Sequence, residues 1–253
     1  MFIPGLVSVT FRSLTVEEII DLCKSNNLTC IEWGSDVHIR SGDFKAAERA
    51  GESCLKNGII PCSYGSYYRM GQGIYEFSKY LDTARALGAK VIRIWAGTKS
   101  PKVLLPSEYD ALLREGTELA RLAEKAGIII ATECHLDTLT EDARTAAGFI
   151  KKIDSPFFAT YWQPNQFKTF GQNEFSAELL SPFTVGIHIF NWDQNGRHPL
   201  FEAKEKWTAY LSHFSGDNIP VMLEFMHDDR PESLAPTASQ LSEILKQFDG
   251  KKE

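Results

Sequence analysis

The chain has 253 residues, of which 43% are hydrophobic and 24% are charged, and its formal net charge at pH 7 is −6. These proportions are ordinary for a globular protein. The negative charge argues against a nucleic-acid partner, because binding to a phosphate backbone needs a basic face. No stretch approaches the roughly 20 consecutive apolar residues of a membrane-spanning helix, which argues against a membrane partner.

The N-terminus and the cysteines both point to the cytoplasm. Residues 1–5 lack the basic start and the long apolar run of a secretory signal peptide. The five cysteines are odd in number and contain no Cys-x-x-Cys pair, so neither a disulfide framework nor a structural zinc site is indicated. We therefore expect reduced, buried thiols in a cytoplasmic protein.

Eight short apolar runs alternate with helical patterns along the chain. The predicted strands cover residues 5–11, 30–34, 61–67, 91–96, 128–135, 157–163, 185–191 and 221–226. The predicted helices cover residues 16–27, 44–57, 75–87, 108–125, 141–153, 175–180, 202–214 and 235–248. Strands that alternate with helices in this way pair in parallel and are joined by right-handed crossovers.

This alternation predicts an α/β fold, a single (β/α)8 TIM barrel domain over residues 1–253, close to the roughly 250 residues typical of that fold. A doubly wound open sheet is the alternative. That fold usually carries a glycine-rich phosphate turn after its first strand, and residues 10–13 contain no glycine. The sixth predicted helix is short, and the polar loop before it, 164–174, has the length of a segment that covers a substrate.

Four polar residues fall near the C-terminal ends of the last four predicted strands: Glu133, Gln163, His188 and Glu224. Strand ends of a parallel barrel share one mouth, so these side chains would meet there. Two carboxylates, an imidazole and an amide oxygen suit a divalent cation. Other interpretations stay open. The acids could form ion pairs with Arg93 or Lys90, the histidine could be a hydrogen-bonded core residue, and the glutamine could bind substrate directly.

Further residues would face the same mouth. His135 lies on the fifth predicted strand, two residues after the first of these acids, and Arg93 and Trp95 share a face of the fourth. Arg93 could neutralise the acids or hold a substrate oxygen. Glu32 on the second strand and Arg197 after the seventh are further candidates for substrate contact, although a solvated loop arginine is the simpler interpretation of Arg197. Tryptophans at strand ends could stack on the C–H faces of a sugar or pack as barrel rim.

These residues and positions resemble the xylose-isomerase-like barrels, specifically the sugar (phosphate) isomerase/epimerase branch, over nearly the whole chain. In that family, acidic residues after strands five, six and eight and a histidine on strand seven bind one divalent metal. Glu133, His188 and Glu224 match three of these positions, and His135 completes the family's strand-five Glu-x-His pattern. The segment 188–200 is similar to a family pattern in which an arginine, here Arg197, reaches the substrate.

One position departs from the family pattern. The strand-six Asp-x-x-His is replaced by Gln163-Pro164-Asn165-Gln166, which removes one negative charge and one histidine. At about 4 Å and an effective dielectric of ~20, one charge pair is worth about 4 kcal/mol, so metal affinity should fall. The remaining ligand set suits Mn²⁺, Mg²⁺ or Co²⁺, with Zn²⁺ as a further candidate cofactor.

The resemblance implies a metal-dependent isomerase or epimerase that acts on a small-molecule sugar or related polyhydroxy ketone. Glu133 and Glu224 would be the catalytic pair, one removing the proton next to the carbonyl and the other protonating the enediolate. An unphosphorylated substrate is favoured, because no glycine-rich turn follows strand seven or eight. The alternatives are an inosose-dehydratase-like lyase and a non-catalytic sugar-binding barrel. An apurinic-site endonuclease of this barrel type would need more metal ligands and a basic face. The sequence leaves open whether the chain forms a homo-oligomer.

Overall fold

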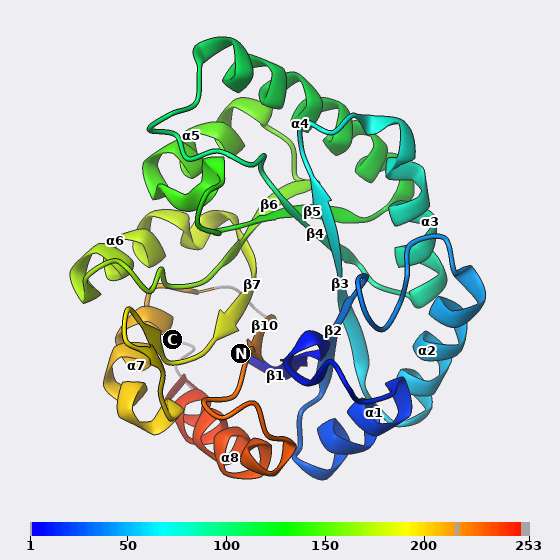
Figure 1. Ribbon diagram of the computed structural model, residues 1–253, viewed down its shortest axis with the longest axis vertical. Helices are drawn as coiled ribbons and strands as arrows, with labels where there is room; N and C mark the ends of the chain where they lie inside the picture. The colour runs from blue at the N-terminus through cyan, green and yellow to red at the C-terminus, as the bar shows by residue number, and fades with distance from the viewer. Residues whose placement is uncertain (1, 216–217, 249–253) are drawn as a thin grey trace.

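The computed structural model describes residues 2–215 and 218–248, and within them eight parallel strands close into a barrel surrounded by helices (Figure 1). The barrel order is β1-β10-β7-β6-β5-β4-β3-β2, so the expected (β/α)8 TIM barrel is confirmed. The barrel strands are β1 (Phe2–Val7), β2 (Cys30–Gly34), β3 (Ile60–Arg69), β4 (Val91–Trp95), β5 (Ile129–Glu133), β6 (Phe158–Trp162), β7 (Thr184–Ile189) and β10 (Ile219–Leu223).

α-Helices follow the barrel strands and cover the outside of the sheet (Figure 1). Their apolar side chains and the outward side chains of the strands form one continuous core. This packing holds the C-terminal ends of all barrel strands at the same edge. The helices are α1 (Val16–Ser25), α2 (Phe44–Lys56), α3 (Phe77–Leu87), α4 (Pro106–Ala126), α5 (Ala143–Ile153), α6 (Phe170–Leu180), α7 (Lys204–Leu211) and α8 (Leu234–Leu245).

The inside of the barrel changes from apolar to polar toward the mouth. Residues two apart on a strand face the same side, so Arg93 stands one step above Val91, and Glu133 one step above Ala131. Val91 and Ala131 belong to a separate apolar cluster that fills the barrel interior. Arg93 and Glu133 therefore lie directly above closely packed apolar side chains.

The first strand differs from the prediction of residues 5–11. A 3₁₀ turn, Ser8–Phe11, follows β1 and takes the chain out of the sheet. The turn forms because two of its side-chain hydroxyl groups accept hydrogen bonds from the backbone of other segments. Ser8 Oγ accepts a hydrogen bond from the Gly34 N–H at 2.9 Å, and Thr10 Oγ1 accepts one from the Phe225 N–H at 3.1 Å. These bonds tie the turn to the ends of neighbouring strands.

The segment after β6 also differs from the prediction. The helix α6 begins at Phe170, not at residue 175, because Thr169 and Gln172 form a capping box there. The preceding loop is correspondingly shorter, so its expected bounds of 164–174 were wrong, and its role in covering a substrate stays a prediction. The segment after β7 instead folds into a small antiparallel hairpin of β8 (Trp192–Asp193) and β9 (Gly196–Arg197).

The other strands and helices overlap their predicted ranges, with ends shifted by a few residues. All five cysteines are free; Cys23, Cys30 and Cys54 are buried as expected, whereas Cys62 and Cys134 are only partly buried. Among the described helices, none combines the length and the apolar character needed to cross a bilayer.

Candidate active site at the barrel mouth

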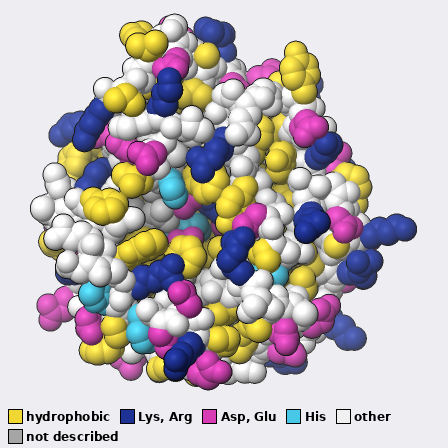
Figure 2. Space-filling model, viewed as in Figure 1, with side chains coloured by type: hydrophobic (Ala, Val, Ile, Leu, Met, Phe, Trp, Pro, Cys, Tyr) yellow, Lys and Arg dark blue, Asp and Glu magenta, His cyan; other side chains and the backbone are white. Residues whose placement is uncertain are grey.

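A cavity of about 350 Å³ opens at the C-terminal ends of the barrel strands. In Figure 2 it is the hollow near the middle of the face, with acidic and histidine side chains at its base and hydrophobic side chains around it. It is lined by Val9, Tyr67, Arg93, Trp95, Glu133, Cys134, His135, Leu136, Gln163, Pro164, Asn165, Gln166, Phe190, Trp192, Glu224 and Phe225.

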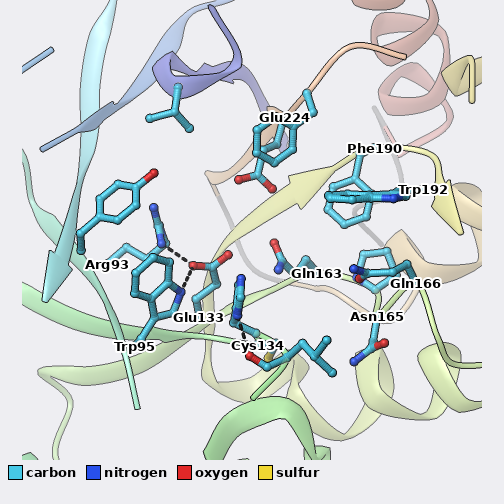
Figure 3. Close-up of a pocket in the computed structure, with 16 residues that line it drawn as sticks. Arg93, Trp95, Glu133, Cys134, Gln163, Asn165, Gln166, Phe190, Trp192 and Glu224 are labelled. Carbon is cyan, nitrogen blue, oxygen red and sulfur yellow. Dashed lines mark hydrogen bonds and ion pairs between the residues drawn. The ribbon is translucent and has the colours of Figure 1, made fainter. Parts of the chain in front are cut away.

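Glu133 is the last residue of β5, and its side chain points into this cavity (Figure 3). Its Oε2 accepts a hydrogen bond from the indole Nε1 of Trp95 at 2.7 Å and another from the guanidinium of Arg93. Burial alone would raise the pKa of Glu133, but Arg93 together with His188 and His135 outweighs burial and lowers it. The carboxylate is therefore held ionised, with Oε1 left to face His188 Nδ1 at 3.8 Å.

His188, on β7, lies fully buried beneath the cavity, and its Nδ1 is surrounded by oxygen atoms. Gln163 Oε1 lies 3.1 Å from Nδ1, and Glu224 Oε2 lies 3.4 Å from it. Both residues come directly after the ends of their strands, β6 and β10. Ligand atoms of Glu133, His188 and Glu224 all lie within 4.8 Å of one another. The structure thus brings together the four strand-end residues that the sequence singles out.

The environment of His188 fixes both its charge and its orientation. Burial alone would lower the pKa of His188, but the carboxylates of Glu224 and Glu32 outweigh burial and raise it to about 10. The imidazole packs edge-on against the ring of Tyr161, with centroids 5.3 Å apart. Gly186 makes room for that ring, since a Cβ there would lie 2.3 Å from it.

A further acid, Glu32, lies below the cavity instead of in its wall. Its carboxylate accepts hydrogen bonds from Ser63 Oγ at 2.6 Å and from Arg93 Nε at 2.7 Å. Burial would raise the pKa of Glu32, but Arg93 and His188 lower it. Arg93 therefore bridges two buried acids. Gly65 leaves the space for this arrangement, because a Cβ there would lie 2.8 Å from Arg93 Nη2.

Three of the five residues expected to contact a substrate line the cavity: Arg93, Trp95 and His135. His135 bonds through Nδ1 to the Leu136 carbonyl at 2.7 Å, and its ring lies 5.3 Å from that of Trp95. Glu32 does not line the cavity. Strand alternation correctly placed it inside the barrel, but its side chain has no exposed surface, so direct substrate contact by Glu32 stays an untested expectation.

Arg197 is also not part of the cavity wall. Its guanidinium pairs with Asp229 and lies 5.0 Å from the ring centroid of Trp192 and 4.5 Å from that of Phe225. The arginine thus supports two aromatic side chains of the wall from behind. In this arrangement the charge of Arg197 is engaged by Asp229, and direct substrate contact by Arg197 stays a prediction.

Sequence reasoning missed much of the aromatic wall, including Tyr67, Phe190 and Phe225. Tyr67 and Phe225 have φ values of 56° and 57°, a conformation that non-glycine residues adopt uncommonly and that often marks functional sites. Tyr67 closes a predicted strand and Phe225 follows Glu224, so extending the strand-end argument to aromatic residues would have found both.

The donor set fits a divalent cation. It consists of two carboxylates, one imidazole nitrogen and one neutral amide oxygen, all directed to the same place. Within the described residues, the carboxylate of Glu224 forms an ion pair only with His188, and Glu133 shares Arg93 with Glu32. The base of the cavity therefore carries an excess of acidic groups that a bound cation would neutralise.

Comparison with known proteins agrees with this architecture. The family model described as "Xylose isomerase-like TIM barrel" matches residues 20–248. A search of curated proteins found no significant match.

Solved structures share the fold at low identity. The probable 3-DHS dehydratase AsbF from Bacillus anthracis is 15% identical, with a TM-score of 0.79 over 96% of this chain and 99% of that chain. The IOLI protein, solved with a zinc atom, is 15% identical, with a TM-score of 0.76 over 98% and 99%. D-Psicose 3-epimerase from Clostridium cellulolyticum H10, solved with D-tagatose, is 11% identical, with a TM-score of 0.70 over 96% and 98%.

Proposed function

Because the chain belongs to the xylose isomerase-like TIM barrel family, we propose that it is a metal-dependent isomerase or epimerase of a sugar or related polyhydroxy ketone. One observation carries the proposal. Glu133, His188 and Glu224 meet within 4.8 Å at the base of a cavity of about 350 Å³. A cavity of that volume is in the range of small-molecule sites.

The cation would be held by Glu133, Gln163, His188 and Glu224. When bound, a divalent cation supplies Lewis-acid polarisation of the substrate carbonyl. The ligand set suits Mn²⁺, Mg²⁺ or Co²⁺. Zn²⁺ is a further candidate, since the IOLI protein was solved with zinc.

The two glutamates would carry the proton transfer. Their carboxylates reach toward a shared space from β5 and from the residue after β10 (Figure 3). One glutamate, as the carboxylate, takes the proton from the carbon next to the carbonyl, and the other, as the carboxylic acid, donates its proton to the enediolate. Delivery from the opposite face of the substrate gives an epimer, whereas transfer between adjacent carbons gives an isomer. Arg93 and Trp95 keep Glu133 oriented during these steps.

The cavity favours an uncharged substrate. Arg93 is the one lysine or arginine in the described wall, and Glu32 and Glu133 already engage its guanidinium. A phosphate group would therefore find no unpaired cationic partner there. The remaining polar groups include the amides of Asn165 and Gln166, and the aromatic rings can stack on the C–H faces of a sugar. We expect a free ketose or a cyclic polyhydroxy ketone.

Solvent deuterium tests this function, because proton transfer next to a carbonyl exchanges the substrate hydrogen with solvent. Mn²⁺-loaded protein is incubated in D₂O with free ketoses and inososes, and the products are examined by mass spectrometry and NMR. We expect one deuterium on the carbon next to the carbonyl. Glu133→Gln and Glu224→Gln should each reduce the rate by about 10²–10⁴-fold. Glu178→Gln, an exposed position on α6, is the control.

Each other result has a definite meaning. A product lighter by one water identifies a lyase, an activity related to that of the dehydratase AsbF. Sugar binding with neither exchange nor elimination identifies a non-catalytic sugar-binding barrel. Either result rejects the isomerase or epimerase proposal, and so does full activity in both glutamine variants.

A further inference from the structure

Glu32 is a buried acid that the proposed proton transfer does not use. It lies on β2 with no exposed surface, and a carboxylate so placed is costly unless its oxygens are satisfied. Ser63 Oγ donates a hydrogen bond to Glu32 Oε2 at 2.6 Å, and Arg93 Nε donates one to Glu32 Oε1 at 2.7 Å. Its third polar neighbour is Nε2 of His188, which lies 3.5 Å from Glu32 Oε2.

The two ring nitrogens of His188 have different surroundings. Nδ1 faces the oxygens of Gln163, Glu224 and Glu133. Nε2 is buried and has no ordinary hydrogen bond, and its contact with Glu32 is longer than such a bond. Gln163 Oε1 and the ionised carboxylates only accept hydrogen bonds, so without a cation both ring nitrogens carry hydrogen, that on Nδ1 directed at Gln163 and that on Nε2 facing Glu32. A cation bound at Nδ1 would take the place of the hydrogen on that nitrogen, and the hydrogen left on Nε2 would stay beside the Glu32 carboxylate.

We propose that Glu32 is a positioning residue that sets the tautomer of His188 and thereby completes the metal site. The inference rests on the proposed function and deepens it. A ligating histidine commonly donates its other N–H to a carboxylate, which orients the ring and strengthens it as a ligand. Glu32 also places a negative charge directly behind a ligand set in which Gln163 is neutral.

Glu32→Gln separates this role from simple packing. Glutamine keeps the shape of the side chain, but its amide can donate a hydrogen bond to Nε2 of His188. The hydrogen of the imidazole then moves to Nδ1, where it occupies the lone pair that the cation needs. We expect the affinity for Mn²⁺ to fall by about 10–100-fold.

Ser63→Ala is the matched control. It removes a hydrogen bond to the same buried carboxylate but leaves the charge of Glu32 and its contact with His188 in place. We expect its affinity for Mn²⁺ to stay within about threefold of the parent protein, because no ligand and no acceptor is lost. Glu224→Gln serves as the reference for loss of a ligand.

The experiment is calorimetric titration of Mn²⁺ into the full-length chain and these variants, with circular dichroism to verify folding. In parallel, ¹⁵N NMR of the zinc-loaded parent protein reports the tautomer directly. The His188 signals are assigned by their absence in His188→Asn. We expect hydrogen on Nε2 and coordination through Nδ1. The NMR arm needs no substitution of Glu32, so hydrogen on Nδ1 would overturn the inference even if Glu32→Gln does not fold.

The outcomes separate the two proposals. Weak binding in Glu32→Gln with near-normal binding in Ser63→Ala, together with hydrogen on Nε2, supports the inference. Affinity of Glu32→Gln within threefold of the parent, or hydrogen on Nδ1, overturns it while leaving the proposed function standing. Failure of the parent protein to bind either metal overturns both.

Discussion

Replacing Arg93 by methionine tests whether one arginine holds the buried acids together. Arg93 is 2% exposed, and its guanidinium bridges Glu32 and Glu133. At a charge separation of about 4 Å and an effective dielectric of ~20, each pair contributes about 4 kcal/mol of Coulomb energy, part of which offsets the cost of burying the charges. Arg93→Met fills much of the space but leaves both carboxylates without their cation. Losing one partner of a buried ion pair typically costs about 3–5 kcal/mol.

We therefore expect Arg93→Met to lower the free energy of unfolding by about 3–5 kcal/mol and the Tm by roughly 6–20 °C, measured by urea and thermal unfolding in EDTA. Adding Glu32→Gln should recover part of the loss, because one uncompensated charge disappears. Mn²⁺ should stabilise Arg93→Met more than the parent protein, because a cation then replaces the missing positive charge beside Glu133. A loss below about 1 kcal/mol, or a double variant less stable than Arg93→Met, refutes this reasoning.

Three further predictions concern neighbouring contacts. Gly186→Ala should destabilise the fold by about 1–3 kcal/mol in urea unfolding, because its Cβ would lie 2.3 Å from the Tyr161 ring; unchanged stability would show that the ring can move. Trp95→Phe should lower kcat by about tenfold or more by removing the 2.7 Å hydrogen bond to Glu133, and an unchanged kcat would dismiss that bond as a positioning contact. Burial raises the pKa of the Cys134 thiol to about 11, so at pH 8 iodoacetamide should label it about two orders of magnitude more slowly in the native protein than in urea; equal rates would contradict this.

The placement of the candidate ligands followed from strand alternation. Residues at the ends of parallel strands in a closed barrel meet at one mouth, so Glu133, Gln163, His188 and Glu224 could be grouped before any coordinates existed. How far each inward side chain lies below the mouth of the barrel could not be predicted in the same way. The pairing of β2 with β3 shifts register beside Glu32, and neither strand's sequence reveals that shift. Glu32 pairs with Ser63, which pairs with Val91, two residues before Arg93 on β4, so Glu32 lies below the cavity while Arg93 reaches it.

Features that depend on contacts between loops were out of reach of the sequence argument. The pairing of Arg197 with Asp229 joins the hairpin after β7 to the segment after β10, and no local pattern indicates it. The start of α6 was accessible but missed. The spacing of Thr169 and Gln172 is that of a capping box, and it begins the helix five residues before the apolar pattern suggested.

The position of a bound ion tests the central claim most directly. A crystal soaked in Mn²⁺ and a free ketose, measured at the manganese absorption edge, locates the metal by anomalous scattering. The account predicts one strong peak within coordination distance, about 2.0–2.4 Å, of Nδ1 of His188 and of carboxylate oxygens of Glu133 and Glu224. A fully soaked crystal with no peak there, or with manganese bound only elsewhere, would contradict it.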